Sequence, residues 1–167
     1  MKPSLLILCL AATATGAQAQ TPRSWNLVAD KAAPDVTLFY GVPQTDDVAL
    51  TLRCPRQTGQ ITVGFGVGAK LADRQSAGVW VDKIGRPAPW PASVVLTSGV
   101  ATTTLRGQAM PDDLDGGTRL AAEVSTRAPV IAAFKKSGVI AASGLGETAS
   151  GPPVPLKLVR PFLSACR

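Results

Sequence analysis

The sequence predicts a mainly β protein, an antiparallel sandwich or partly open barrel with one flanking helix and a short C-terminal helix. Three observations support this fold class. Several short runs alternate apolar and polar residues, as half-buried strands do. Glycine, proline and aspartate separate these runs. One internal segment, residues 126–138, carries apolar residues at helical spacing. Short alternating runs with turn residues between them are typical of sandwiches and barrels.

The first 19 residues predict a secretory signal peptide. Lys2 supplies the positive start, residues 5–12 form the apolar stretch, and residues 17–19 read Ala-Gln-Ala, a small-residue cleavage site. The apolar stretch is shorter than the roughly 18 to 20 residues that span a bilayer. We therefore expect cleavage after Ala19, a single mature domain of residues 20–167 without a transmembrane segment, and a periplasmic or secreted location.

The two cysteines outside the leader predict a disulfide. Residues 36–40 and 48–54 read as the two arms of a hairpin, and Cys54 lies on the apolar face of the second arm. Cys9 leaves with the signal peptide, so Cys166 is the remaining partner. Two cysteines in an oxidising compartment usually pair. We predict a Cys54–Cys166 bond, which the chain-entropy model values at about 4 to 5 kcal/mol.

The other elements follow from the same patterns. We expect strands at residues 25–29, 61–67, 93–97, 100–105, 120–124 and 139–142 and a loop at residues 144–155. The helix is expected to start at a Ser125 or Thr126 cap and to end at Gly138. A second short helix is expected at residues 156–166, with a kink at Pro161.

Glycines line one face of the expected strand at residues 61–67. Gly64, Gly66 and Gly68 leave this face bare, which allows a bend, a close backbone approach or a ligand, so they are candidate contact residues. The same run matches the GxGxxA dinucleotide fingerprint, with Asp82 as the later acid. The intervening segment is too short for the required crossover helix. We expect no cofactor.

Two loops hold further candidates. Trp90 lies in a proline-stiffened connection, residues 84–91. Its ring is either exposed for recognition of a partner or folded back over the edge of the sheet, and large aromatic residues are more often folded back than exposed. Asp112, Asp113 and Asp115 are weak calcium candidates, since their spacing lacks the EF-hand pattern and supplies too few oxygens. We expect a solvated turn and no metal.

The composition excludes the better-marked catalytic classes. The chain has no histidine, which excludes Ser-His-Asp and Cys-His catalysis and histidine metal sites. Neither SxxK nor GxSxG occurs. A carboxylate pair for glycoside cleavage is conceivable if Asp46 or Asp47 meets a distant acid such as Asp113 or Glu123. Turn chemistry explains the adjacent aspartates without catalysis.

The charge balance bears on partners. Of the 17 basic residues, Lys2 falls in the leader, which leaves 16 against 11 acidic residues, a net charge of +5. The basic residues are scattered along the sequence, whereas nucleic-acid binders concentrate them and add stacking aromatics. We therefore expect no nucleic-acid partner and a bias toward anionic neighbours such as lipid headgroups or cell-wall polymers.

Two families resemble parts of the chain. Phe134, Ser137-Gly138 and residues 162–166 (Phe-Leu-Ser-Ala-Cys) resemble the C-terminus of small exported proteobacterial proteins of uncharacterised function, and residues 40–43 and 50–54 are similar to their N-terminal part. This resemblance implies no activity.

The second resemblance is to periplasmic lysozyme inhibitors, small β-barrels with a strand ending in cysteine. Their Ser-Gly-x-x-Tyr motif corresponds to Ser98-Gly99-Val100-Ala101, which Thr102 follows here. Lysozyme is basic, so the net positive charge opposes such a pairing at long range.

Together these observations predict an exported, non-catalytic binding or envelope-associated protein of unknown ligand. Its partner would be an envelope protein or an anionic cell-wall component. The alternatives are a periplasmic inhibitor of a cell-wall hydrolase and, less favoured, a carboxylate-dependent glycoside hydrolase.

Overall fold

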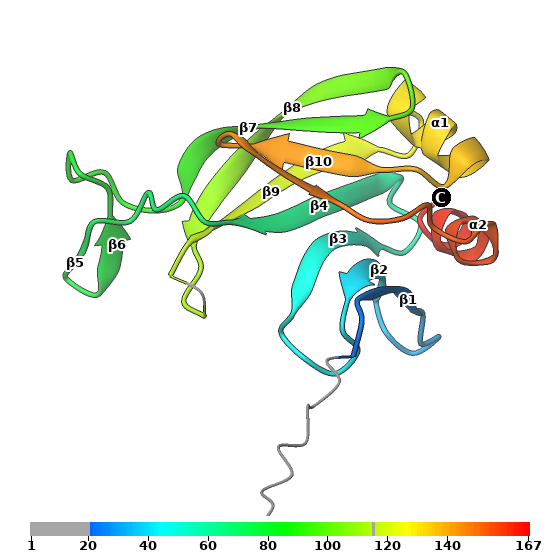
Figure 1. The fold of residues 1–167 in the computed structure, drawn as a ribbon, viewed down its shortest axis with the longest axis horizontal. Helices are drawn as coiled ribbons and strands as arrows, with labels where there is room; N and C mark the ends of the chain where they lie inside the picture. The colour runs from blue at the N-terminus through cyan, green and yellow to red at the C-terminus, as the bar shows by residue number, and fades with distance from the viewer. Residues whose placement is uncertain (1–20, 115) are drawn as a thin grey trace, which may run out of the picture.

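The structure is a computed structural model that describes residues 21–114 and 116–167 (Figure 1). The predicted leader and Asp115 lie outside the described residues. The elements are β1 (Ser24–Val28), β2 (Asp35–Gly41), β3 (Val48–Pro55), β4 (Gln60–Val67), β5 (Arg74–Ser76), β6 (Val79–Val81), β7 (Trp90–Ser98), β8 (Ala101–Pro111), β9 (Thr118–Ser125), α1 (Pro129–Ser137), β10 (Ala141–Gly144), β11 (Glu147–Ser150) and α2 (Leu156–Ala165).

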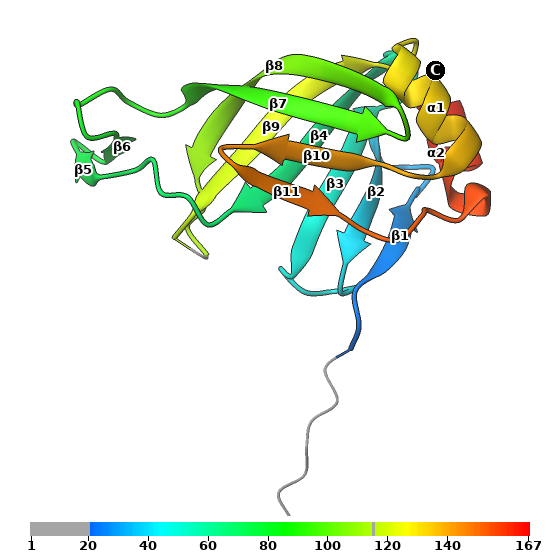
Figure 2. The same cartoon turned by 45° about the horizontal axis from the view of Figure 1, so that its top comes forward.

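Nine of the strands form one antiparallel sheet in the order β1-β2-β3-β4-β9-β8-β7-β10-β11. The sheet curls on itself, so that β10 and β11 pass in front of β3 and β4 (Figure 2). The indole Nε1 of Trp25 in β1 donates a 2.7 Å hydrogen bond to the carbonyl oxygen of Pro152, which bridges the two ends of the curl. The predicted mainly β class is confirmed, in the form of a half-barrel.

Alternating apolar residues fill the inside of the curl. Leu38, Leu52, Phe65 and Leu120, from four neighbouring strands, are all fully or almost fully buried. A Cβ at Gly144 would lie 2.6 Å from Leu120 Cδ1, so the curl needs a residue without a side chain at this point of β10. The core therefore extends through the half-barrel from β2 to β10.

The predicted disulfide joins β3 to the end of α2, with Cys54 and Cys166 separated by 112 positions in the sequence and a Cα–Cα distance of 5.7 Å. The β3–β4 turn adds two backbone hydrogen bonds to the same chain end. The amide of Gln57 donates to Ala165 O at 3.0 Å, and the amide of Gly59 donates to Cys166 O at 2.8 Å. The C-terminal helix is thus fixed at the end of the half-barrel that carries the β3–β4 turn.

Both predicted helices are present, and one detail of the first is wrong. Neither Ser125 nor Thr126 caps α1, because the helix starts one residue after Ala128, which offers no side-chain cap. Ser125 instead accepts a hydrogen bond from the Arg127 amide in the preceding turn. Gly138 ends the helix as predicted, with a φ of 70°.

Three parts of the sheet differ from the predictions. β11 lies within residues 144–155, where we expected a loop, and β8 runs six residues beyond the expected end at residue 105. Residues 74–81 form a separate two-stranded hairpin, β5–β6. β5 and β11 are largely polar and exposed, so they lack the apolar alternation that marks a half-buried strand.

Candidate functional site

The structure gathers basic side chains into an open groove of about 980 Å³ between α1, α2 and the β3–β4 turn. We call this the basic groove. Its charged residues are Arg127, Lys135, Lys136, Arg160 and Arg167, and none of its lining residues is acidic. The scattered basic residues of the sequence therefore come together in space, which the sequence analysis missed.

Separate segments position these five cations. Arg127 precedes α1, Lys135 and Lys136 occupy the last turn of α1, Arg160 lies on α2, and Arg167 follows the end of α2. The negative end of the α1 dipole favours the two lysines. It does not account for Arg127 at the opposite end of α1 or for Arg160 on another helix. Packing of α2 against α1 is what brings Arg160 to the lysines.

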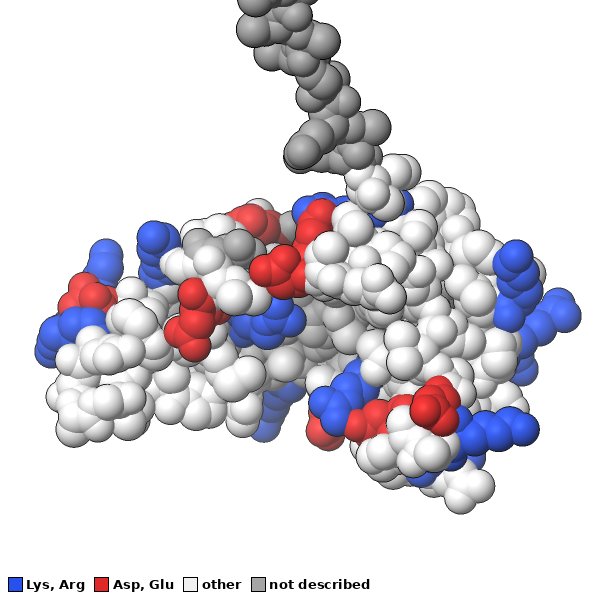
Figure 3. Space-filling model, turned by 90° about the horizontal axis from the view of Figure 1, so that it is seen from below, with Lys and Arg blue, Asp and Glu red and all other residues white. Residues whose placement is uncertain are grey.

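The groove cations have no carboxylate partners among the described residues. The ion pairs that the structure shows are Arg23–Asp47, Arg53–Asp35, Arg74–Asp73, Arg86–Asp82 and Arg119–Asp112. None of them involves a groove residue. At the upper right of Figure 3, at the end of the molecule that carries the helices, a group of basic side chains has no acidic side chain beside it; lower on the same side, acidic and basic side chains lie together. Such a concentration of one sign creates a positive potential over the groove.

A second cavity, of about 520 Å³, opens at the other end of the half-barrel, between the β2–β3 turn, the β8–β9 turn and β11. We call this the barrel mouth. It brings Asp46 and Asp47 together with Asp112 from a distant segment. The glycoside-hydrolase alternative requires such a gathering of acids, although the distant acid is Asp112 and neither Asp113 nor Glu123 lines the cavity.

Two of the mouth carboxylates already have basic partners. Arg23 contacts Asp47 at 2.5 Å, and this interaction raises the pKa of the Arg23 guanidinium above its ordinary value. Asp112 accepts hydrogen bonds from the Leu114 amide at 3.2 Å and from Arg119 at 3.5 Å. A general acid must carry a proton to donate. Carboxylates placed as acceptors for guanidinium groups fit a structural role at the mouth better.

The glycine face meets this mouth in part. Gly66 and Gly68 line the cavity, whereas Gly64 does not. A Cβ at Gly66 would lie 3.7 Å from Asp112 Oδ2, and a Cβ at Gly68 would lie 3.6 Å from Glu147 Oε1. The carboxylates of the surrounding loops therefore border the space that these two glycines leave open.

The geometry does not match a dinucleotide-binding site or a calcium site. The segment that would have to be a crossover helix contains the β5–β6 hairpin, and Asp82 folds into the loop that follows β6. Of the calcium candidates, Asp115 is outside the described residues and Asp112 is engaged as above. Within residues 21–114 and 116–167, no group of three or more Asp, Glu, Cys or His side chains is arranged to hold a metal ion.

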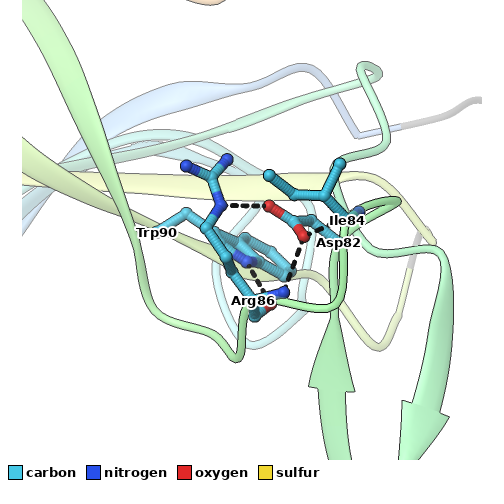
Figure 4. Close-up of polar contacts among 4 residues, drawn as sticks. All are labelled: Asp82, Ile84, Arg86 and Trp90. Carbon is cyan, nitrogen blue, oxygen red and sulfur yellow. Dashed lines mark hydrogen bonds and ion pairs between the residues drawn. The ribbon is translucent and has the colours of Figure 1, made fainter.

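Trp90 is buried, with 4 % of its surface exposed, so it does not present its ring to a partner. Its Nε1 donates a 2.9 Å hydrogen bond to Arg86 O (Figure 4). The exposed-recognition interpretation is corrected, and the ring folds back as large aromatics usually do. Its hydrogen bond leads to the loop of residues 82–86, whose internal hydrogen bonds the sequence analysis did not predict.

That loop is organised around the Asp82 carboxylate. Asp82 Oδ1 accepts hydrogen bonds from the Ile84 and Arg86 amides at 3.1 and 2.8 Å, and Oδ2 accepts one from Arg86 Nε at 2.7 Å (Figure 4). Burial raises the pKa of the Asp82 carboxyl, but the hydrogen bonds from Arg86 and Ile84 lower it more, and it lies below the ordinary value. An Asp followed two residues later by a bonded amide is an Asx-turn, a local signal that the sequence did contain.

Ser98, the serine of the lysozyme-inhibitor comparison, is 1 % exposed. Its Oγ lies 3.5 Å from the Ser137 Oγ, at the junction of β7 and α1. The residue that carries this resemblance therefore faces the inside of the protein.

The chain matches no protein-family model, and no curated protein or solved structure is significantly similar to it. Among the described residues, no helix has the length and apolar character to cross a membrane. A function has to be argued from the sites themselves.

Proposed function

We propose that the protein is an exported, non-catalytic binding protein that holds an anionic polymer of the cell envelope in the basic groove. The observation that carries this proposal is the set of five cations with no acid among the groove residues and no ion pair to a described carboxylate. The Cys54–Cys166 disulfide supports an oxidising compartment.

The chemistry of the groove fits phosphate or carboxylate groups. Arg127, Arg160 and Arg167 offer planar guanidinium groups, which bind both kinds of anion with two parallel hydrogen bonds. Lys135 and Lys136 add point charges on one helix end. Cations from separate segments along an open groove suit an extended chain of charges better than one small anion.

The binding test uses two anionic polymers and a neutral one. Inorganic polyphosphate represents phosphate polymers, polygalacturonate represents carboxylate polymers, and dextran is uncharged. We expect binding of at least one polyanion, weakening as salt is added because exposed charges are screened, and no binding of dextran. Isothermal titration calorimetry gives the affinities.

A double variant locates the site. Replacing Arg127 and Arg160 with Gln removes two guanidinium groups that lack carboxylate partners, and the expected loss of affinity is about tenfold or more, since a hydrogen bond to a charged group is worth roughly 1.5 to 3 kcal/mol. The matched control is Arg106→Gln, which removes an exposed arginine from β8. The proposal fails if the double variant binds as tightly as Arg106→Gln, or if neither polyanion binds.

A further inference from the structure

A hairpin arm projects from the half-barrel at the end opposite the helices. The arm comprises residues 69–89 and contains β5, β6 and the loop of residues 82–86 (Figures 1 and 2). It is antiparallel from Arg74–Val81 to Ser76–Val79 and is closed by the Ala88 amide, which donates to Trp80 O at 2.9 Å. Neither the predicted function nor the basic groove uses it.

The loop of residues 82–86 is rigidly built. Besides the three hydrogen bonds to its carboxylate, Asp82 makes two backbone bonds within the loop, from its own amide to Arg86 O and from the Gly85 amide to its carbonyl. The buried Trp90 indole bonds the same Arg86 carbonyl (Figure 4). The loop conformation is therefore fixed before any partner arrives, which lowers the entropy cost of binding.

This fixed loop presents an apolar side chain to solvent. Ile84 is 74 % exposed, and its neighbours Lys83 and Arg86 are also exposed. The one acidic residue of the loop, Asp82, is 8 % exposed and bonded inside it. The loop thus shows a branched aliphatic group between Lys83 and Arg86, and the Arg86 side chain is 66 % exposed although its Nε bonds the Asp82 carboxylate. Val79, at the start of β6, is a second exposed apolar residue on the arm.

We propose that the arm docks on the surface of an anionic lipid bilayer, with Ile84 entering the headgroup region and Lys83 and Arg86 facing the lipid phosphates. Transfer of an aliphatic side chain out of water lowers the free energy, and Lys and Arg near such a surface are attracted to anionic lipids. Their long stems let the charged ends stay in the headgroups while the apolar residue lies deeper.

The surroundings of the loop favour a bilayer over a protein cleft. The arm as a whole carries Lys70, Arg74, Lys83 and Arg86 against Asp73 and Asp82. Both acids are engaged by arginines of the arm itself. The net charge is positive, and the projecting shape lets the loop reach a surface while the half-barrel stays clear of it (Figure 1). This surface is separate from the basic groove and does not depend on polymer binding.

The test measures partition of the mature protein onto vesicles by co-sedimentation. One set of vesicles holds equal parts of phosphatidylglycerol and phosphatidylcholine, and the other holds phosphatidylcholine alone. We expect weak binding to the anionic vesicles that falls with added salt, and little binding to the neutral ones. Ile84→Ser is expected to reduce the partition coefficient about tenfold, and Lys83→Gln about fivefold.

Matched controls separate the arm from the rest of the surface. Val100→Ser removes an even more exposed aliphatic residue, 104 % exposed against 74 % for Ile84, from the β7–β8 turn at the other end of the sheet. Lys31→Gln removes an exposed lysine from the β1–β2 turn. Both are expected to bind vesicles as the wild type does, and so is the groove variant with Arg127 and Arg160 replaced by Gln.

Three results would overturn the proposal. The first is no binding of the wild-type protein to anionic vesicles. The second is an Ile84→Ser variant that partitions as the Val100→Ser control does. The third is loss of vesicle binding in the groove variant alone, which would assign lipid contact to the basic groove. Capture of an envelope protein that depends on Ile84, without any vesicle binding, would assign the arm to a protein partner instead.

Discussion

The Cys54–Cys166 disulfide between β3 and the C-terminal helix gives the most quantitative prediction. Replacing Cys54 and Cys166 together with Ala removes the bond and leaves no free thiol in the described chain. Because the two cysteines are 112 positions apart in the sequence, the chain-entropy model predicts a loss of about 5 kcal/mol from the freer unfolded state. This is comparable with the whole stability of a typical domain, about 5 to 15 kcal/mol.

The assay is urea unfolding followed by tryptophan fluorescence. Trp25 is a suitable reporter because its ring packs against Tyr40 at a centroid distance of 5.3 Å and bonds Pro152 near the seam of the half-barrel. The slope of free energy against urea should rise, because without the bond the unfolded chain is less compact and exposes more surface to solvent. Phe162→Ala is the control, since Phe162 is fully buried on α2 and its truncation should cost about 3 to 5 kcal/mol by cavity formation.

The bond is not the only contact that holds the chain end in the folded state. The hydrogen bonds from Gln57 and Gly59 to the chain end remain, and so does the packing of Phe162 and Leu163. We therefore expect polyanion binding by the basic groove to change less than in the arginine double variant. A free-energy change below about 1 kcal/mol would refute the chain-entropy argument and show that α2 packing alone fixes the chain end.

Two further predictions concern single positions. Gly138→Ala should destabilise the protein by more than the roughly 1 kcal/mol that a left-handed conformation costs a residue with a side chain, because the added Cβ would overlap the Val154 carbonyl oxygen. Gly99→Ala is the control, since Gly99 has a φ of 58° and open space around it. Equal losses of stability in urea unfolding of the two variants would contradict the clash at Gly138. Asp82→Asn should speed trypsin cleavage after Lys83, because the carboxylate holds the loop. Since the pKa of Asp82 is lowered in the folded protein, its stabilisation is present above the ordinary carboxyl pKa and is lost as the pH falls through the lowered value. The measurement is the protection of the loop amides against hydrogen exchange, relative to an unstructured peptide at the same pH. Protection that stays constant as the pH falls through this range would refute the argument.

The β2–β3 hairpin and the disulfide were predictable because their signals in the sequence are local. Val36 and Leu38 alternate with polar residues, and so do Leu50 and Leu52, and all four are fully buried. Period-two alternation fixes which face of a strand points inward. Cys54 shares that face, and pairing followed from elimination.

The candidate sites were only partly predictable. Gly66 and Gly68 do line a cavity, as a bare strand face allows, but the carboxylates beside them come from loops that no local pattern connects to β4. Trp90 gave no exposed contact because its indole finds a carbonyl partner and the ring packs inside. What a loop residue meets depends on chain segments far away in the sequence.

The sequence by itself determined the fold class, the inward faces of the main strands, the presence of the first helix and its end at Gly138, and the cysteine pairing. Only the tertiary structure decided that β11 closes the curl, that the arm projects, and that Arg127, Lys135 and Arg160 share one groove. Periodicity reports the burial of each segment against its own neighbours. The meeting of charges from separate segments depends on how α2 docks on α1, which no single segment encodes.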